Sequence, residues 1–136
     1  MKHRVLVTGG AGYLGSVLCE ELIAKGFEVT AVDCLFYRQR SLLHLCASPS
    51  FEFVNGDVRD ETLMRKLVDG ADVLIPLAAL VGAPACDRDP SLAKSVNLDA
   101  VRLLNRLRST SQLVVFPTTN SGYGTKSGDM YCTEET

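Results

Sequence analysis

The sequence lacks three features that would mark particular classes of protein. No apolar run approaches the roughly 20 residues that a membrane-spanning helix needs. Lysine and arginine form no cluster, and the formal net charge is −2, so an electrostatic grip on nucleic acid is not expected. The five cysteines include no C-x-x-C pair, and widely spaced thiols in odd number are typical of a reduced, cytosolic chain. We therefore expect a soluble cytoplasmic protein that binds neither nucleic acid nor membranes.

Metal and P-loop chemistry are also missing from the pattern. The two histidines, His3 and His44, stand alone, whereas a metal site needs three or four convergent ligands. The spacing Gly10-x-x-x-x-Gly15-Ser16 is similar to that of a P-loop but lacks the lysine that would reach the β- and γ-phosphates. The sequence therefore predicts no metal centre and no P-loop.

The feature that stands out is a glycine-rich turn near the N-terminus. An apolar strand over Val5–Val7 leads into Thr8–Gly12, and a helix is expected to begin at Tyr13. The glycines follow the spacing Gly9-x-x-Gly12-x-x-Gly15. Such a turn lets the backbone approach a pyrophosphate, while the helix N-terminus presents unpaired N–H groups to it. Taken alone, the turn could also serve simply to reverse the chain after a strand, which is the less favoured alternative.

An acidic residue after the next strand narrows the interpretation. The second apolar strand, residues 27–32, ends in Asp33, which lies 18 residues after Gly15. A dinucleotide site places a carboxylate there to accept hydrogen bonds from the adenosine ribose. Its charge would repel a 2′-phosphate and so favour NAD over NADP, although the nearby Arg38 and Arg40 weaken that preference. The alternative is a solvated carboxylate at a strand end.

Apolar strands and amphipathic helices alternate along the chain. The pattern predicts an α/β fold of the Rossmann type, a doubly wound parallel sheet with helices on both faces and strand order 3-2-1-4-5. Residues 77–90 are expected to form a long loop that contacts a ligand. The strands are expected at residues 5–7, 27–32, 51–54, 72–75 and 113–116. Helices are expected to begin at residues 13, 61 and 90, with a further one around 42–46. The first helix is expected to face the sheet with Leu14, Val17, Leu18 and Leu22.

In such a sheet ligands bind beyond the carboxyl ends of the strands. Asp57, after the third strand, could accept from the amine of an adenine or simply shape a turn. Ala78 and Ala79 offer only room for a ligand to pass. Asn97 is either an exposed surface amide or a buried one that ties its helix to the loop after the fourth strand. Thr118 and Thr119 either hydrogen-bond a substrate or merely end the fifth strand.

Together these segments resemble a known family. The residues that carry the resemblance are Thr8-Gly-Gly-Ala-Gly-Tyr-Leu-Gly15, Asp33, Gly56-Asp-Val-Arg-Asp60, Leu77-Ala-Ala79, Asn97 and Thr118-Thr-Asn-Ser-Gly-Tyr-Gly124. Their order is similar to that of the extended short-chain dehydrogenase/reductases, and within them the NAD-dependent nucleotide-sugar epimerases and dehydratases. The resemblance spans the whole chain.

The resemblance implies a role for each matching position. Gly9, Gly12 and Gly15 would form the pyrophosphate turn of an NAD site, with backbone atoms of Tyr13 and Leu14 against it. Asp33 would hold the ribose, and Thr119 would be the catalytic Ser/Thr that orients a sugar hydroxyl while the sugar gives hydride to NAD. The other implied cofactor-site residues are Asp57 and Val58 beside adenine, Leu77, Ala78 and Ala79 along the ribose and nicotinamide, Asn97 as a structural asparagine, and Thr118.

One part of the family pattern is absent. A Tyr-x-x-x-Lys pair, in which the lysine lowers the tyrosine pKa, occurs nowhere in the 136 residues. We therefore expect a truncated chain: residues 1–124 as the NAD-binding part, and residues 125–136 as a polar tail leading toward a missing catalytic helix and substrate lobe.

Such a chain would be inactive alone. The longer protein would act on a nucleotide-sugar, and a homodimer is left open. The alternatives are a non-catalytic dinucleotide-sensing regulator or binding module and, more remotely, a methyltransferase that uses S-adenosylmethionine.

Overall fold

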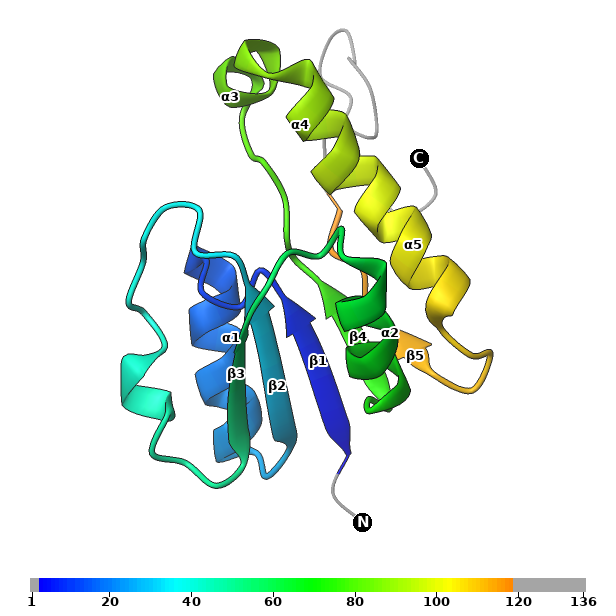
Figure 1. Ribbon diagram of the computed structural model, residues 1–136. Coiled ribbons are helices and arrows are strands. Elements are labelled where there is room, and N and C mark those ends of the chain that lie inside the picture. Colours follow the sequence, from blue (N-terminus) through cyan, green and yellow to red (C-terminus); the bar gives the residue numbers. More distant parts are fainter. Residues whose placement is uncertain (1–2, 119–136) are drawn as a thin grey trace, which may run out of the picture.

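A five-stranded parallel sheet with helices on both faces forms the body of the protein (Figure 1). The computed structural model describes residues 3–118. Its elements, in chain order, are β1 (Arg4–Thr8), α1 (Tyr13–Ala24), β2 (Glu28–Asp33), the 3₁₀ turn η1 (Leu43–Leu45), β3 (Phe51–Asn55), α2 (Glu61–Asp69), β4 (Val73–Pro76), α3 (Ala83–Arg88), α4 (Pro90–Lys94), the π-helical segment η2 (Ser95–Asp99), α5 (Ala100–Leu107) and β5 (Leu113–Val114).

The sheet has the predicted order, β3-β2-β1-β4-β5, and every pairing is parallel. Strand β1 lies at the centre, with Val5 opposite Val29 on one side and Val73 on the other. Because the chain leaves β1 in one direction and later returns to its other side, the loops that follow β1 and β4 are adjacent at the carboxyl edge. This is the switch point at which α/β sheets bind ligands.

Successive side chains along each strand point to opposite faces of the sheet, so the core forms two layers. Leu6, Val32 and Leu74 face α2 and α5, and residues of those helices such as Met64 and Leu103 complete this layer. Residues one position away in the strands, Val5, Ala31 and Ile75 among them, face α1 and the η1 turn. Strands covered on both faces read as continuous apolar runs, as β4 does and as β1 does between Arg4 and Thr8.

The caps of three helices follow the predicted residues. Gly26, just past the end of α1, has φ +87°, and both Gly26 and Phe27 donate backbone hydrogen bonds into the last turn of that helix. The Asp60 carboxylate accepts from Leu63 N at 3.1 Å at the start of α2. Asp89 accepts from Leu92 N at 2.9 Å at the start of α4, with Pro90 in the first position of the helix.

The inward face of α1 is the predicted one only in part: Leu18 and Leu22 pack against the core, but Leu14 and Val17 do not. Leu14 and Val17 are 53% and 55% exposed, whereas Gly15 and Cys19 are buried against the sheet. A Cβ on Gly15 would collide with Gly9 O, so the closest approach of helix and turn occurs at this glycine. The rotation of the helix about its axis is therefore set by the position that has no side chain, and two larger apolar residues face outward.

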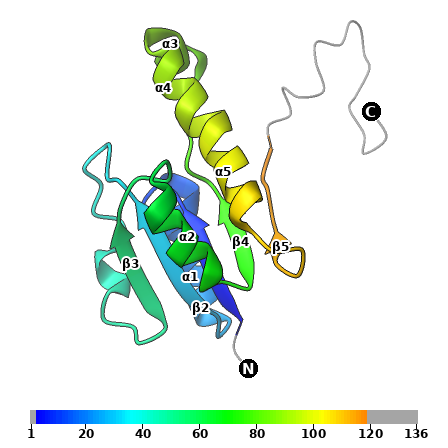
Figure 2. The same cartoon turned by 45° about the vertical axis from the view of Figure 1, so that its right-hand side comes forward.

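Three further predictions need correction in detail. Residues 77–90 are not a plain loop, because α3 forms within them and rises with α4 beyond the carboxyl edge of the sheet (Figure 2). The helix expected around residues 42–46 is a single 3₁₀ turn. Strand β5 covers two residues rather than four: Leu113 and Val114 pair with Val73 and Leu74 of β4, and one further bond runs from Val115 N to Leu74 O.

Candidate functional site

The glycine-rich turn lies at the carboxyl end of β1, and its shape is dictated by close packing. Gly9 has φ +68°, and a Cβ there would stand 2.6 Å from the backbone nitrogen of Ala78. A Cβ on Gly10 would stand 2.7 Å from that of Ala31, and Gly15 is crowded by the turn itself. These three glycines are therefore required by the protein's own fold.

Gly12 differs from the other glycines of the turn. It occupies the N-cap of α1, and a Cβ on it would meet one protein atom within 4 Å, Gly9 O at 3.2 Å. No side chain caps the first turn of α1, and that turn contains no acidic residue. The N-terminus of a 12-residue helix thus has open space in front of it, which is what the close approach of a pyrophosphate requires.

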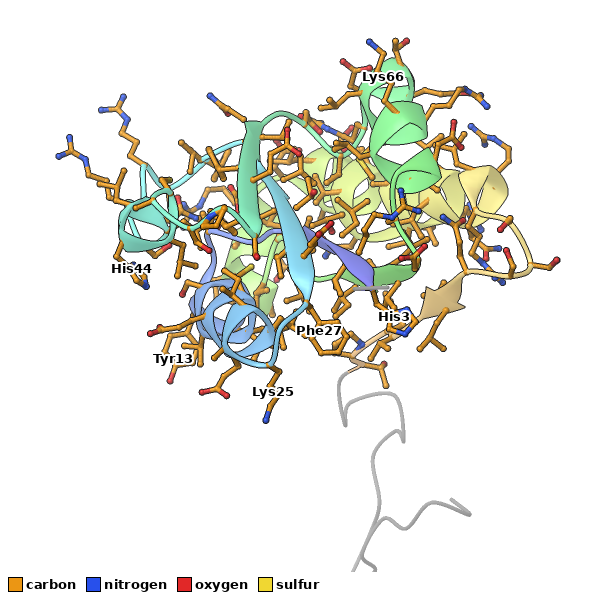
Figure 3. The ribbon with its side chains drawn as sticks, turned by 90° about the horizontal axis from the view of Figure 1, so that it is seen from below. His3, Tyr13, Lys25, Phe27, His44 and Lys66 are labelled. Atoms are coloured by element: carbon orange, nitrogen blue, oxygen red, sulfur yellow. The ribbon has the colours of Figure 1, made fainter. Side chains whose placement is uncertain are left out.

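The side chains of Tyr13 and Leu14, in the first turn of α1, are exposed. Tyr13 is 94% exposed, and its ring points away from the body of the protein in Figure 3. Contact between a ligand and the backbone of these two residues stays a prediction.

Asp33 lies at the end of β2 beside the turn. It is 8% exposed, and both carboxylate oxygens accept backbone hydrogen bonds, Oδ2 from Ala11 N at 3.0 Å and Oδ1 from Leu35 N at 2.8 Å. The alternative of a freely solvated carboxylate is wrong. Each oxygen retains a second lone pair that could accept from a ribose hydroxyl.

The loop after Asp33 is held in an unusual conformation. Leu35 and Arg38 both have positive φ, +53° and +55°, and Arg38 N donates to Leu35 O at 2.8 Å. The buried Oε1 of Gln39 in this loop has no hydrogen-bond partner within residues 3–118. Buried acceptors are normally satisfied, so a donor from a ligand or a water fits there.

Asp57 is engaged with a neighbour in the turn after β3. Its Oδ1 accepts from Arg59 N at 2.9 Å, and the Arg59 guanidinium bonds both carboxylate oxygens. The hydrogen bond from the Arg59 side chain holds the pKa of Asp57 below its ordinary value. This shows the turn-forming role of Asp57, and its contact with an adenine stays a prediction. Val58 is buried in the core that faces α2 and α5.

Thr8 connects the turn to the loop after β4. Its backbone oxygen accepts from Leu77 N at 3.0 Å, and its buried hydroxyl accepts from Ala78 N at 3.2 Å. Leu77 and Ala78 are half-buried and Ala79 is exposed. Leu77 and Ala78 lie beside Gly9, so the structure brings together the loops that follow β1 and β4.

Asn97 ties its helix to the same loop. Its Oδ1 accepts from Leu80 N at 2.8 Å, and its Nδ2 donates to Leu80 O at 2.9 Å. The residue lies in the π-helical segment η2, and π-helical turns inside α-helices are frequent at functional sites. Of the two predicted roles, the tie is correct, although the residue as a whole is exposed rather than buried.

The predicted catalytic residue lies outside the described part of the chain. Thr119, the rest of the segment to Gly124 and the tail over residues 125–136 all follow residue 118. Thr118 is exposed beyond the end of β5. The roles of Thr118 and Thr119 therefore stay predictions.

Two contacts at this edge were missed by the sequence reasoning. The Ser41 hydroxyl donates to Ala11 O at 2.7 Å, and the Arg59 guanidinium, besides binding Asp57, donates to Ser95 Oγ at 3.2 Å. Serine and arginine in polar loops carry no periodicity that marks them. The spacing Asp57-Val-Arg59 indicates that Arg59 could pair with Asp57, but no sequence signal indicates its bond to Ser95.

Membrane and metal chemistry find no support in residues 3–118. No helix there has both the length and the apolar character to cross a membrane. Nor does this part of the chain gather three His, Cys, Asp or Glu side chains into a group that could hold a metal ion.

Comparison with known sequences gives a consistent family. A model of the NAD dependent epimerase/dehydratase family matches residues 5–136. The chain is 34% identical over 125 residues to a UDP-N-acetyl-alpha-D-glucosaminuronate decarboxylase of Bacillus cytotoxicus, covering 91% of this chain and 39% of that protein. It is 35% identical over 127 residues to a UDP-glucose 4-epimerase of Mycolicibacterium smegmatis, covering 90% and 41%. The chain thus spans about two fifths of the length of these relatives.

Comparison with solved structures supports the same fold. A UDP-glucuronic acid 4-epimerase from Bacillus cereus, in complex with UDP-glucuronic acid and NAD, matches with a TM-score of 0.85 at 27% identity, over 97% of this chain and 44% of that one. A UDP-glucose-4-epimerase from Stenotrophomonas maltophila, with bound NAD and formylated UDP-arabinopyranose, matches with a TM-score of 0.82 at 30% identity, over 93% and 40%.

Proposed function

The chain belongs to the NAD dependent epimerase/dehydratase family, and on that premise we propose that it is the NAD-binding part of an enzyme that modifies nucleotide-sugars. The observation that carries the proposal is the open space at Gly12, in front of an uncapped helix N-terminus and beside the buried carboxylate of Asp33. A pyrophosphate fits the first feature and a ribose diol the second. The residues present therefore suit a dinucleotide.

Each part of the edge would bind a different part of NAD. The backbone N–H groups at the start of α1 would bind the pyrophosphate, and Asp33 would accept from the adenosine ribose. Asp57 and Val58 would adjoin the adenine. Leu77 to Ala79, held by Thr8 and Asn97, would line the path of the second ribose and the nicotinamide, which when bound accepts a hydride from the sugar.

Within the family, the reaction that we propose is epimerisation or dehydration of a nucleotide-sugar. The predicted classes, epimerase and dehydratase, share transient hydride transfer, and the relatives include decarboxylases as well as epimerases. Thr119 would orient the sugar hydroxyl. Because the 136 residues contain no Tyr-x-x-x-Lys pair, we propose that this chain alone binds NAD without turning over a nucleotide-sugar.

Calorimetric titration of the purified 136-residue chain tests the cofactor assignment. We expect saturable one-to-one binding of NAD, weaker binding of NADP because the Asp33 carboxylate repels a 2′-phosphate, and no binding of S-adenosylmethionine. A preference for S-adenosylmethionine, or no saturation by millimolar NAD, would contradict the assignment. Turnover of UDP-glucose by the chain alone would contradict the proposed inactivity.

A non-catalytic dinucleotide-sensing module is the second candidate. The observation that favours it is the same missing Tyr-x-x-x-Lys pair. Both candidates predict NAD binding, so binding does not separate them. Sequencing the native reading frame beyond Thr136 separates them. A Tyr-x-x-x-Lys pair there would support the enzyme, and its absence would support the module.

A further inference from the structure

Ser41 belongs to the loop after β2 but bonds to the middle of the glycine-rich turn. Its Oγ donates to Ala11 O at 2.7 Å across 30 residues of sequence, and the residue is half-buried. Ala11 itself is 3% exposed. We propose that Ser41 is a positioning residue, which orients the phosphate-binding turn through the Ala11 carbonyl. This inference rests on the proposed function, because it presumes that the turn binds a dinucleotide.

One planar peptide unit connects Ser41 to the N-terminus of α1. The carbonyl of Ala11 and the N–H of Gly12 belong to the same rigid plane. Ser41 holds the carbonyl side of this plane, and Gly12 N donates to Gly9 O at 3.0 Å on the other side. Both ends of the plane are therefore fixed, and the plane leads directly into Gly12, the N-cap of α1.

Ala11 is held on its other side as well. Its N–H donates to Asp33 Oδ2, so both polar backbone groups of Ala11 are satisfied by side chains of the β2 end and the loop after it. The two side chains have different roles in the proposed site. Asp33 would also accept from the ribose, whereas the single hydroxyl proton of Ser41 is already given to Ala11 O.

The loop that carries Ser41 is shaped to bring it there. Leu35 and Arg38 adopt left-handed backbone conformations, which are unfavourable for residues with side chains. Leu35 N is bonded by Asp33 and Arg38 N by Leu35 O. Strained backbone persists where surrounding contacts determine it, and such strain clusters at ligand sites.

The test is the affinity of the 136-residue chain for NAD and ADP-ribose, which carry a pyrophosphate, and for adenosine, which does not. With Ser41→Ala we expect affinity for NAD and ADP-ribose to fall by about tenfold, since a buried carbonyl loses its partner. Affinity for adenosine should change little. Ser41→Thr keeps a hydroxyl and should restore most of the affinity.

Ser48→Ala is the matched control. Ser48 lies in the same connection, and its Oγ accepts from Ser50 N at 3.3 Å, away from the turn. We expect unchanged affinity for NAD in this variant. Hydrogen exchange of the Gly12 amide should accelerate in Ser41→Ala and not in Ser48→Ala. This measurement shows, without any ligand, whether the peptide unit between Ala11 and Gly12 is held less firmly.

The outcomes separate this inference from the proposed function. If the unsubstituted chain does not bind NAD, the proposed function fails and this inference fails with it. If it binds and Ser41→Ala binds equally well, or loses affinity for adenosine to the same extent as for NAD, only the positioning role of Ser41 is overturned. Should Ser41→Ala not fold, Ser41→Cys, a weaker donor, must bind NAD more weakly than Ser41→Thr for the inference to stand.

Discussion

The two sides of the carboxyl edge are constructed differently. Beside β1 and β2, the turn and loop backbones are bonded to side chains that are buried or half-buried, those of Asp33 and Ser41. Beside β4, Leu77 and Ala78 are anchored by Thr8, and the loop beyond them is held at Leu80 by the exposed Asn97 and by the half-buried thiol of Cys86, which donates to Leu80 O at 3.4 Å. The turn and loop of the first side are bonded to each other, while the second side depends on α3 and η2, which belong to the helices that rise beyond the sheet (Figure 2). In the proposed binding mode, the adenosine and pyrophosphate of NAD, which do not react, would lie on this first side.

The largest expected effect comes from filling the crowded part of the turn. Gly9→Ala should lower the free energy of unfolding by about 3–5 kcal/mol, because its Cβ would meet the Ala78 backbone and φ is positive. Gly26→Ala is the matched control, since φ there is also positive but nothing lies within 4 Å. It should cost about 1 kcal/mol. Urea denaturation measures both, and equal losses would show that the turn is not held by packing.

A substitution on the side of the edge beside β4 should lower the free energy of unfolding less than Gly9→Ala does. Asn97→Ala removes two hydrogen bonds to Leu80 and should lower the free energy of unfolding by about 1–2 kcal/mol. Asn105→Ala, on an exposed surface of α5, should cost under about 0.5 kcal/mol. Hydrogen exchange should accelerate at Leu80 and not at Ala11. Faster exchange at Ala11 in the Asn97 variant would contradict the independence of the two sides.

The smallest effect concerns the opposite edge of the sheet, away from both loops. Asp72 accepts from the backbone and the guanidinium of Arg4, and these bonds lower the pKa of its carboxyl to about 2. A depressed pKa stabilises the fold above the ordinary carboxyl pKa, and this contribution is lost as pH falls from about 4 through 2.

Asp72→Asn tests this pH dependence. The variant should differ from the parent in urea denaturation near neutral pH and converge with it near pH 2. A constant difference across that range would show that the carboxyl is not perturbed. NAD affinity should stay the same at neutral pH, because Asp72 lies at the amino end of β4.

The parts of the molecule that could be predicted from sequence are those fixed by local chemistry. The order of the strands follows from the alternation of elements, and Asp60 and Asp89 cap helices because they lie directly before them. The outward positions of Leu14 and Val17 could not be predicted, because Gly15 sets the rotation of α1 through a contact with the turn. The same holds for the site: Asp33 and the glycines follow a spacing, whereas Ser41 acts across 30 residues through a backbone carbonyl.

Gly12 distinguishes a turn that only folds from a turn that also binds. Gly9, Gly10 and Gly15 are explained by the protein's own atoms, but a Cβ on Gly12 would meet only Gly9 O, at 3.2 Å. The most direct measurement is therefore the NAD dissociation constant of Gly12→Ala together with its free energy of unfolding. We expect the dissociation constant to rise by at least about tenfold and stability to fall by about 1 kcal/mol or less. An NAD affinity equal to that of the unsubstituted chain would contradict the assignment of this space to the pyrophosphate.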